Sequence, residues 1–263
     1  ALAAVGSTTA LINIFTNLFI GISLGANVLA ARYFAAGRDK EMSEAVHTAI
    51  TLALISGVIM AFVGVGMSRT ALSLMATPPD VIDLSAVYMR IYFMGMPFFM
   101  LYNYGAAILR AVGDTKRPLV FLIAAGLTNV VLDLLLVIVI LLGVAGVAIG
   151  TVASQMISCI LVLRCLYKSE GSYQLRFSRL MIRWVYLKRI FQVGIPAGIQ
   201  STVINFSNAL LQSSVNSFGS TAMAGYTAAN NILGFLYAAV NAVTQACMSF
   251  TSQNYSVGKQ KRM

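Results

Sequence analysis

The stretch from Pro118 to Leu163 constrains the fold more than any other part of the chain, because it contains a single charged residue, Asp133. It is too long for one membrane-spanning helix, which needs about 20 apolar residues at about 1.5 Å of rise each. Gly143 and Gly146 interrupt the run and predict a tight turn between two helices. The sequence therefore predicts a helical hairpin buried in lipid.

Similar apolar runs recur along the whole chain. Apolar residues make up 59% of the 263 residues and charged residues 10%, which leaves too little polar surface for a water-soluble domain. The runs lack the period-two alternation that is typical of a transmembrane barrel. We therefore predict an all-α integral membrane protein, a polytopic helix bundle. Its seven predicted spans are Ala10–Ala31, Ala45–Met67, Leu84–Leu109, Pro118–Leu142, Val147–Leu166, Ile190–Phe218 and Met223–Phe250.

Lys and Arg are distributed unequally between the two ends of these spans. Sixteen of the 18 basic residues follow the first, third, fifth or seventh span, and only Arg69 and Arg90 do not. Under the positive-inside rule the basic end is cytoplasmic. Because membrane orientation accounts for the net charge of +10, we expect no nucleic-acid partner.

The connector of residues 168–189 has a helical pattern of its own. Arg176, Arg179 and Arg183 share one face, and Trp184 belongs to an apolar face. This pattern predicts an amphipathic helix on the inner leaflet, with Trp184 at the height of the headgroups; a plain solvated linker is the alternative. His47 is interpreted as a solvated residue at the cytoplasmic end of the second span.

Amide side chains form stripes at helical spacing on three predicted spans. Polar groups are costly in hydrocarbon unless they face a cavity or one another. We therefore predict that the stripes line a wet substrate cavity; hydrogen bonding between helices is the alternative. The stripes consist of Asn13, Asn17 and Asn27, of Ser201, Asn205, Asn208, Gln212 and Asn216, and of Asn230, Tyr237, Asn241 and Gln245.

Asp133 is the only acidic residue deep inside a predicted span, and it lies one helical turn after Asn129. Near the middle of the membrane it must be protonated, bind a cation or pair with another helix. A structural hydrogen bond is the alternative. For catalysis, Asp133 would need a second carboxylate as a partner, and the spans contain none. Gly-rich phosphate-binding motifs are also absent. We therefore expect neither an enzyme nor an organic cofactor, and the cysteines show no metal spacing.

Four motifs resemble, in their order and spacing, the multidrug and toxic compound extrusion (MATE) family. Leu109–Pro118 resembles the loop between the family's fourth and fifth helices, and Asn129–Asp133 resembles its fifth helix. Gly194–Gly198 and Gln253–Tyr255 resemble its seventh helix and the loop after its eighth. The resemblance covers essentially the whole chain, from the family's second helix to just past its eighth.

The resemblance implies two six-helix lobes related by a pseudo-twofold axis along the membrane normal. Residues 1–167 would form the first lobe without its first helix, 168–189 a cytoplasmic amphipathic linker, and 190–263 the start of the second lobe. A faint repeat between residues 1–42 and 222–263 agrees with this plan. We therefore expect a fragment of a longer, monomeric protein of the prokaryotic inner membrane, surrounded by membrane lipids.

The resemblance also implies a function, which is the exchange of small organic, often cationic, compounds for Na⁺ or H⁺ by alternating access. The family's cation site uses an Asn and an Asp of the fifth helix and a Thr of the sixth. These correspond to Asn129, Asp133 and Thr151, whereas Ile204 and Asn205 stand where some members have a second acid.

Two other kinds of membrane protein are alternatives to such an exchanger. A lipid-linked oligosaccharide flippase of the same superfamily is the main alternative, although its pyrophosphate would require basic cavity residues that the spans lack. The second alternative is a seven-helix receptor or retinal protein. The last span has no Lys for a Schiff base, and the repeat between the first and last spans is foreign to such folds.

Overall fold

The computed structural model describes residues 2–74, 79–216 and 220–259. These ranges contain helices and no strand, which confirms the all-α prediction. The α-helices are α1 (Leu2–Ala35), α2 (Asp39–Leu74), α3 (Pro79–Met94), α4 (Met96–Ala111), α5 (Lys116–Asp133), α6 (Gly143–Lys168), α7 (Trp184–Asn216) and α8 (Ser220–Ser256). A π-helix, η1 (Leu134–Val139), follows α5, and a 3-10 helix, η2 (Phe177–Arg179), precedes α7.

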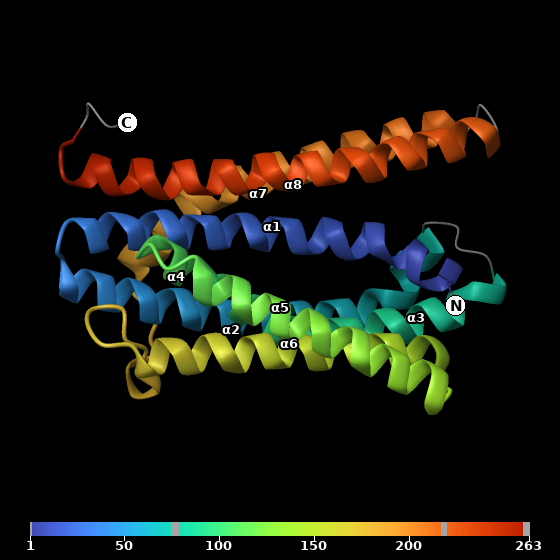
Figure 1. Cartoon of the computed structure of the whole chain (residues 1–263), viewed down its shortest axis with the longest axis horizontal. Coiled ribbons are helices and arrows are strands. Elements are labelled where there is room, and N and C mark those ends of the chain that lie inside the picture. Colours follow the sequence, from blue (N-terminus) through green and yellow to red (C-terminus); the bar gives the residue numbers. More distant parts are fainter. Residues whose placement is uncertain (1, 75–78, 217–219, 260–263) are drawn as a thin grey trace.

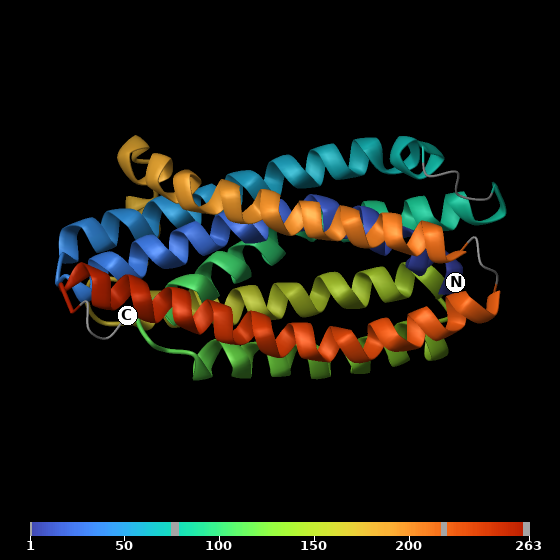
Figure 2. The same ribbon diagram turned by 90° about the horizontal axis from the view of Figure 1, so that it is seen from above.

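The long helices run roughly along one common axis, and α1 lies at their centre. It contacts α2, α3 and α4 on one side, and α7 and α8 on the other. In Figure 1, α7 and α8 form a layer above α1, and α2 to α6 lie below it. Figure 2 shows the same bundle from above, with α7 and α8 side by side over the rest. The hairpin of α5 and α6 packs onto α3 and α4 mainly through α6.

The helices have the length and surface of membrane spans. Five described segments are long and apolar enough to cross a membrane, and the bent pair of α3 and α4 would be a sixth. α7, which has 33 residues, is not among them. On α5, Leu119, Ile123 and Leu127 are each more than half exposed. An apolar surface of this kind is suited to contact with lipid tails rather than water.

The predicted span over Leu84–Leu109 is not a single straight helix, because the helix breaks at Gly95 and the two parts, α3 and α4, are bent by 46°. Pro97 has no N–H to donate to the carbonyl one turn earlier, and its ring crowds that carbonyl. Gly95 also lies directly against α6. A Cβ atom at Gly95 would be only 2.7 Å from Val152 and 3.1 Å from Gln155 Oε1.

The predicted α-helix over Pro118–Leu142 is also interrupted. The α-helix ends at Asp133 and continues as η1, in which the N–H of Ile140 donates to the carbonyl of Leu135 at 3.0 Å. The predicted turn is confirmed at Gly143, which has a φ of +55°. Gly146 instead lies inside α6, where a Cβ atom would be 3.2 Å from the backbone of Leu136. That glycine therefore allows α6 to approach η1 closely.

The connector of residues 168–189 is not one amphipathic helix, since between the end of α6 at Lys168 and the start of α7 at Trp184 it contains only the short helix η2. Trp184 is 71% exposed at the start of α7. The connector is instead held by α2, which explains why the interpretation of His47 as solvated is wrong. His47 is 2% exposed, and its Nε2 accepts a hydrogen bond from the N–H of Arg176 at 3.0 Å. Its Nδ1 therefore carries the proton and donates to the carbonyl of Ser43 at 2.6 Å.

α1 and α7 approach each other through glycines on both helices. A Cβ atom at Gly21 would be 2.3 Å from the Cα of Gly198, and one at Gly25 would be 2.9 Å from the N of Gly194. Only glycine permits such contact between two backbones. The Gly194–Gly198 motif therefore joins α7 to the bundle.

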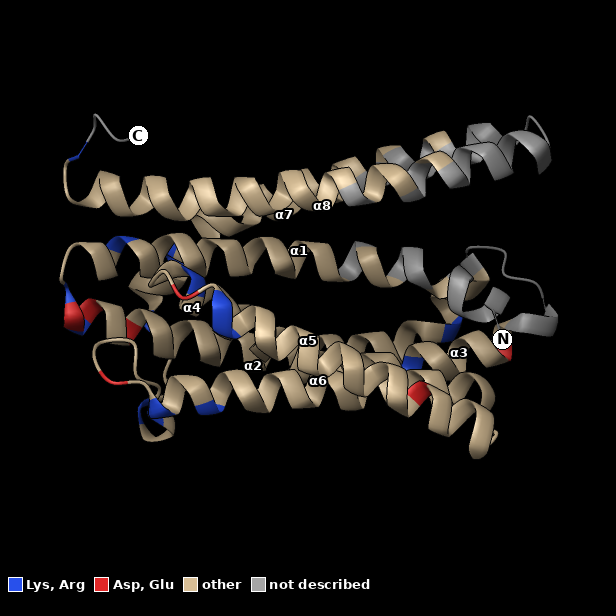
Figure 3. Ribbon diagram, viewed as in Figure 1, with Lys and Arg blue, Asp and Glu red and all other residues tan. Residues whose placement is uncertain are grey.

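Charged residues mark one end of this bundle. Figure 3 shows most of the Lys and Arg residues at the end where α1 meets α2 and α4 meets α5, with few at the opposite end. The unequal distribution of Lys and Arg between the ends of the predicted spans is thus also seen in the structure, where these residues gather at one end of the bundle.

Candidate functional site

The α5–α6 hairpin brings together the three residues of the predicted cation site. Asn129 and Asp133 lie one turn apart near the end of α5, and Thr151 lies on α6. Asn129 and Thr151 line one cavity of about 530 Å³. Asp133 lies beside it, because a Cβ atom at Gly150, the neighbour of Thr151, would be 2.2 Å from Asp133 Oδ1. Gly150 is therefore the residue that leaves room for the carboxylate between the two helices.

Two polar atoms of this site are buried without a hydrogen-bond partner in the described part of the chain. They are Nδ2 of Asn129 and Oδ1 of Asp133. A buried polar group without a partner costs about 1–3 kcal/mol, and more when it is charged. Thr151 does have a partner, since its hydroxyl donates to the carbonyl of Val147 at 2.9 Å and leaves the oxygen's lone pairs free. The carboxylate of Asp133 and the hydroxyl oxygen of Thr151 can therefore accept a proton or coordinate a small cation between α5 and α6.

The π-helix η1 begins directly after Asp133. A π-helical turn contains an extra residue, so it changes the direction of the side chains on either side of it, and such turns are frequent at functional sites. The sequence of η1 is entirely apolar and contains neither Gly nor Pro. No local signal for this feature was available to sequence reasoning.

Asp133 does not lie near the middle of its span. It is followed by only the six residues of η1 before the chain turns, whereas 17 residues precede it in α5. Gly150 lies correspondingly close to the start of α6, which begins at Gly143. The candidate site is therefore nearer the end of the bundle that is poor in Lys and Arg.

Sequence reasoning missed several residues that line the same cavity. Gln155 lies one turn after Thr151, and its Oε1 is buried without a partner among the described residues. The spacing rule that joined Asn129 to Asp133 could have found it. Arg110, in the last turn of α4, was assigned to a loop and yet lines the cavity. The other polar residues that line it are Ser23, Tyr102, Asn103, Ser154, Ser158 and Gln245.

The structure places the predicted amide stripes only in part. Gln245 lines the cavity with Asn129, whereas Tyr237 and Asn241 are exposed on α8. Asn13 is exposed on α1 and Asn17 is half-buried. The side chains of Asn205, Asn208, Gln212, Asn216 and Asn230 lie outside the described residues. Of the described members, Gln245 is thus the one that shares a cavity with the candidate cation site.

Asn27 follows the alternative interpretation, in which an amide joins two helices. Its Nδ2 donates to the carbonyl of Ala107 on α4 at 2.8 Å, and its Oδ1 accepts from the hydroxyl of Ser249 on α8 at 2.8 Å. Two neighbouring bonds hold α8 in the same place. Ser252 donates to the carbonyl of Val28, and Gln253 to that of Ala111.

The motif Leu109–Pro118 forms the turn between α4 and α5. Gly113 has a φ of +89°, and the N–H of Asp114 donates to the carbonyl of Leu109 at 2.9 Å. Asp114 Oδ1 accepts a hydrogen bond from the N–H of Arg117 at 3.1 Å. The motif therefore fixes the direction in which α5, and with it Asn129 and Asp133, leaves α4.

Comparison with known proteins identifies the family. The family model MatE matches residues 1–135 and 196–263. The chain belongs to the MatE family. This MatE chain is 30% identical over its whole length to the probable multidrug resistance protein YoeA of Bacillus subtilis. It is 32% identical over 99% of its length to YpnP of the same organism, and it covers 58% of each of these relatives.

Solved structures agree with the MatE fold. A MATE crystal structure in the bent conformation matches with a TM-score of 0.87 over 97% of this chain and 57% of that one, at 22% identity. A MOP superfamily transporter from Pyrococcus furiosus matches with a TM-score of 0.86 over the same shares, at 24% identity. The MatE chain thus spans somewhat more than half the length of the proteins it matches.

Proposed function

We propose that the protein is a secondary efflux transporter that exchanges small organic, cationic compounds for Na⁺ or H⁺ by alternating access. The observation that supports this proposal best is the buried, unpartnered Oδ1 of Asp133, beside the cavity that Asn129 and Thr151 line. The family supports it as well, since relatives such as YoeA carry the name of multidrug resistance proteins.

The chemistry of the three residues is suited to a coupling ion. A carboxylate inside a span is costly to keep charged, by about 3 kcal/mol at a helix centre and by less toward the end of a span, where Asp133 lies. A bound proton or Na⁺ removes that cost. Na⁺ would be coordinated by oxygen, which Asp133 and Thr151 supply and which Asn129 supplies if its amide turns by half a rotation. A cation that binds one arrangement of the helices more tightly than another shifts the equilibrium between them.

The composition of the cavity argues against a lipid-linked pyrophosphate as the substrate. Apart from Arg110, its polar lining consists of amide and hydroxyl side chains. A lipid-linked pyrophosphate would require several basic groups in place of one. We propose that the amide stripes, with Gln245 at the described cavity, form part of the path of the substrate.

Replacement of Asp133 by Asn tests the coupling role. Asp133→Asn keeps the shape of the side chain and removes both its charge and its titration. In proteoliposomes it should abolish gradient-driven export and leave membrane insertion and substrate binding intact. Asp83→Asn is the matched control, because Asp83 is an exposed acid that pairs with Arg69 at 3.2 Å. Full gradient-driven export by Asp133→Asn would return Asp133 to a structural role.

We also propose that the basic end of the bundle faces the cytoplasm. In a variant without Cys159, Cys165 and Cys247, single cysteines test this orientation. A cysteine at Gly37, in the turn after α1, should resist a membrane-impermeant thiol reagent in intact cells. A cysteine at Leu142, in the turn between η1 and α6, should react. The reverse labelling pattern would show the opposite orientation.

A further inference from the structure

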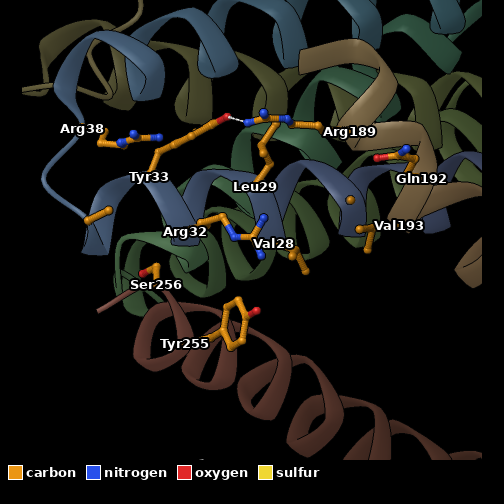
Figure 4. A pocket seen from close by; sticks show the side chains of 12 residues that line it. Val28, Leu29, Arg32, Tyr33, Arg38, Arg189, Gln192, Val193, Tyr255 and Ser256 are labelled. Carbon is orange, nitrogen blue, oxygen red and sulfur yellow. Dashed lines mark hydrogen bonds between the residues drawn. The ribbon is translucent and has the colours of Figure 1, made fainter. Parts of the chain in front are cut away.

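Three arginines surround a second cavity, at the basic end of the bundle. Its volume is about 710 Å³, and it lies between the last turns of α1, the first turns of α7 and the end of α8. Figure 4 shows Arg38, Tyr33 and Arg189 in a row, with Arg32 and Tyr255 facing each other below them. The guanidinium of Arg189 donates to the hydroxyl of Tyr33. That of Arg32 lies 5.5 Å from the centre of the Tyr255 ring.

The positive charge of this cavity is largely without counter-charge. Arg38 pairs with Glu41 at 3.7 Å, and both side chains are partly exposed. Neither Arg32 nor Arg189 forms an ion pair with a carboxylate of the described chain. Arginine remains charged at any physiological pH. A cleft lined by charges of one sign concentrates ions of the other sign, so the cavity is suited to an anion.

An apolar groove of about 390 Å³ continues from this cavity along α8. Val28, Arg32, Val193 and Tyr255 line both. From Tyr255 the groove extends to Met248 and Cys247, about two helical turns further from the basic end. The cavity and the groove together, here named the double pocket, are thus cationic at the helix ends and apolar toward the middle of the bundle.

We propose that the double pocket binds an acidic phospholipid from the leaflet at the basic end. The three arginines would hold the phosphate, because a guanidinium offers two parallel N–H groups to its oxygens. One acyl chain would occupy the apolar groove. An inorganic phosphate could use the arginines alone, whereas a diacyl lipid also explains why an apolar groove begins at the same four residues. The proposal does not depend on the transport function proposed above.

Titration of the purified protein with two lipids of equal acyl chains tests this site. Dioleoyl phosphatidylglycerol and dioleoyl phosphatidylcholine are added separately in detergent, and bound lipid is counted by native mass spectrometry. Phosphatidylglycerol should bind at least tenfold more tightly. Arg32→Gln/Arg189→Gln should lose roughly 25-fold in its affinity for phosphatidylglycerol, or about fivefold for each arginine near an anionic surface.

Two further variants separate headgroup from chain. Lys188→Gln/Lys259→Gln removes the same charge at the same end from residues outside the double pocket, and it should keep the wild-type affinity. Cys247→Trp fills the groove and should weaken phosphatidylglycerol binding without affecting inorganic phosphate. If the double arginine variant fails to insert, Arg32→Gln alone should show the fivefold loss, since it keeps the bond between Arg189 and Tyr33.

Three results would overturn the proposal. The first is equal binding of phosphatidylglycerol and phosphatidylcholine by the wild type. The second is an equal loss of affinity in the arginine and lysine variants, which would indicate a diffuse surface effect. The third is a combination of two observations: inorganic phosphate displaces phosphatidylglycerol at an equal concentration, and Cys247→Trp leaves phosphatidylglycerol binding unchanged. Together they would indicate a site for a soluble anion.

Discussion

The close contact between α1 and α7 predicts that replacing a glycine there by alanine destabilises the protein, which is opposite to the usual effect of this replacement in a helix. Gly→Ala in a helix interior normally stabilises by about 1 kcal/mol. At Gly21 the new Cβ atom would be 2.3 Å from both the N and the Cα of Gly198, and 3.1 Å from the backbone carbon of Ala197. All three atoms belong to the backbone, so no side chain can rotate away, and the helices must separate.

The size of that separation sets the magnitude. Carbon atoms make favourable contact at about 3.5–4.0 Å, so α1 and α7 must move apart by more than about 1 Å. Overpacking that shifts the backbone costs about 1–3 kcal/mol, and a gap of about 1 Å loses up to half of the dispersion energy across it. We therefore expect Gly21→Ala to lower the free energy of unfolding by about 3 kcal/mol.

Gly66→Ala is the matched control, because Gly66 lies on α2 and, apart from the adjoining backbone of α2 itself, nothing lies within 4 Å of the position of a Cβ. It should leave stability unchanged or raise it by about 1 kcal/mol. Both variants can be measured by SDS titration in mixed micelles, with the single Trp, Trp184, as the fluorescent probe. The double variant Gly21→Ala/Gly198→Ala should cost less than the sum of its parts, since the helices are already apart. A Gly21→Ala protein as stable as Gly66→Ala would refute the close contact.

Two further predictions concern single amides. Asn27→Leu removes the partner of the Ala107 carbonyl and of the Ser249 hydroxyl, so it should lower the free energy of unfolding by about 1–3 kcal/mol. Asn13→Leu, at an exposed position, should change that free energy little, and equal effects of the two variants would contradict the bridging role of Asn27. Gln245→Leu should impair export in proteoliposomes and leave membrane insertion intact. Thr244→Ala, at an exposed neighbour whose hydroxyl donates to a carbonyl within α8, should export normally. Normal export by Gln245→Leu would contradict the place of Gln245 on the substrate path.

The positions of the helices could be predicted from the sequence, because lipid imposes a simple rule on composition. The charge-free stretch around Asp133 and the turn at Gly143 predict the α5–α6 hairpin, and the structure contains it. The two breaks within helices differ in this respect. The break at Gly95 has a local signal in Pro97, two residues later, whereas η1 contains no residue that marks it.

The connector was mispredicted for a related reason. The spacing of Arg176, Arg179 and Arg183 is compatible with a helix, but the backbone at Arg176 and Arg183 donates hydrogen bonds to His47 and Thr48 on α2. A helix would have to give up those bonds. Local periodicity does not contain this information, because the partners lie more than a hundred residues away.

The candidate site was predicted to different degrees by two kinds of reasoning. The spacing of Asn129 and Asp133 placed them on one face, and the structure agrees. Thr151 was joined to them only by the resemblance to the MATE family, and its cavity with Asn129 is a finding of the structure. Gln155 was overlooked although it follows Thr151 by one turn. Whether a cation binds among these residues stays a prediction.

Asn27 and Asn129 show what separates an amide that holds helices together from one that is available for a ligand. Both lie in predicted spans, and composition and spacing treat them alike. Asn27 satisfies both of its polar atoms with α4 and α8, so a ligand there would have to displace existing bonds. Asn129 has a buried amide nitrogen without a partner, and Asp133, one turn later, has a carboxylate oxygen in the same condition. Unpartnered buried groups lower stability. A proton or a cation would satisfy the carboxylate oxygen, whereas the amide nitrogen requires an acceptor, so Asp133 is the residue of the pair on which the proposed coupling role depends.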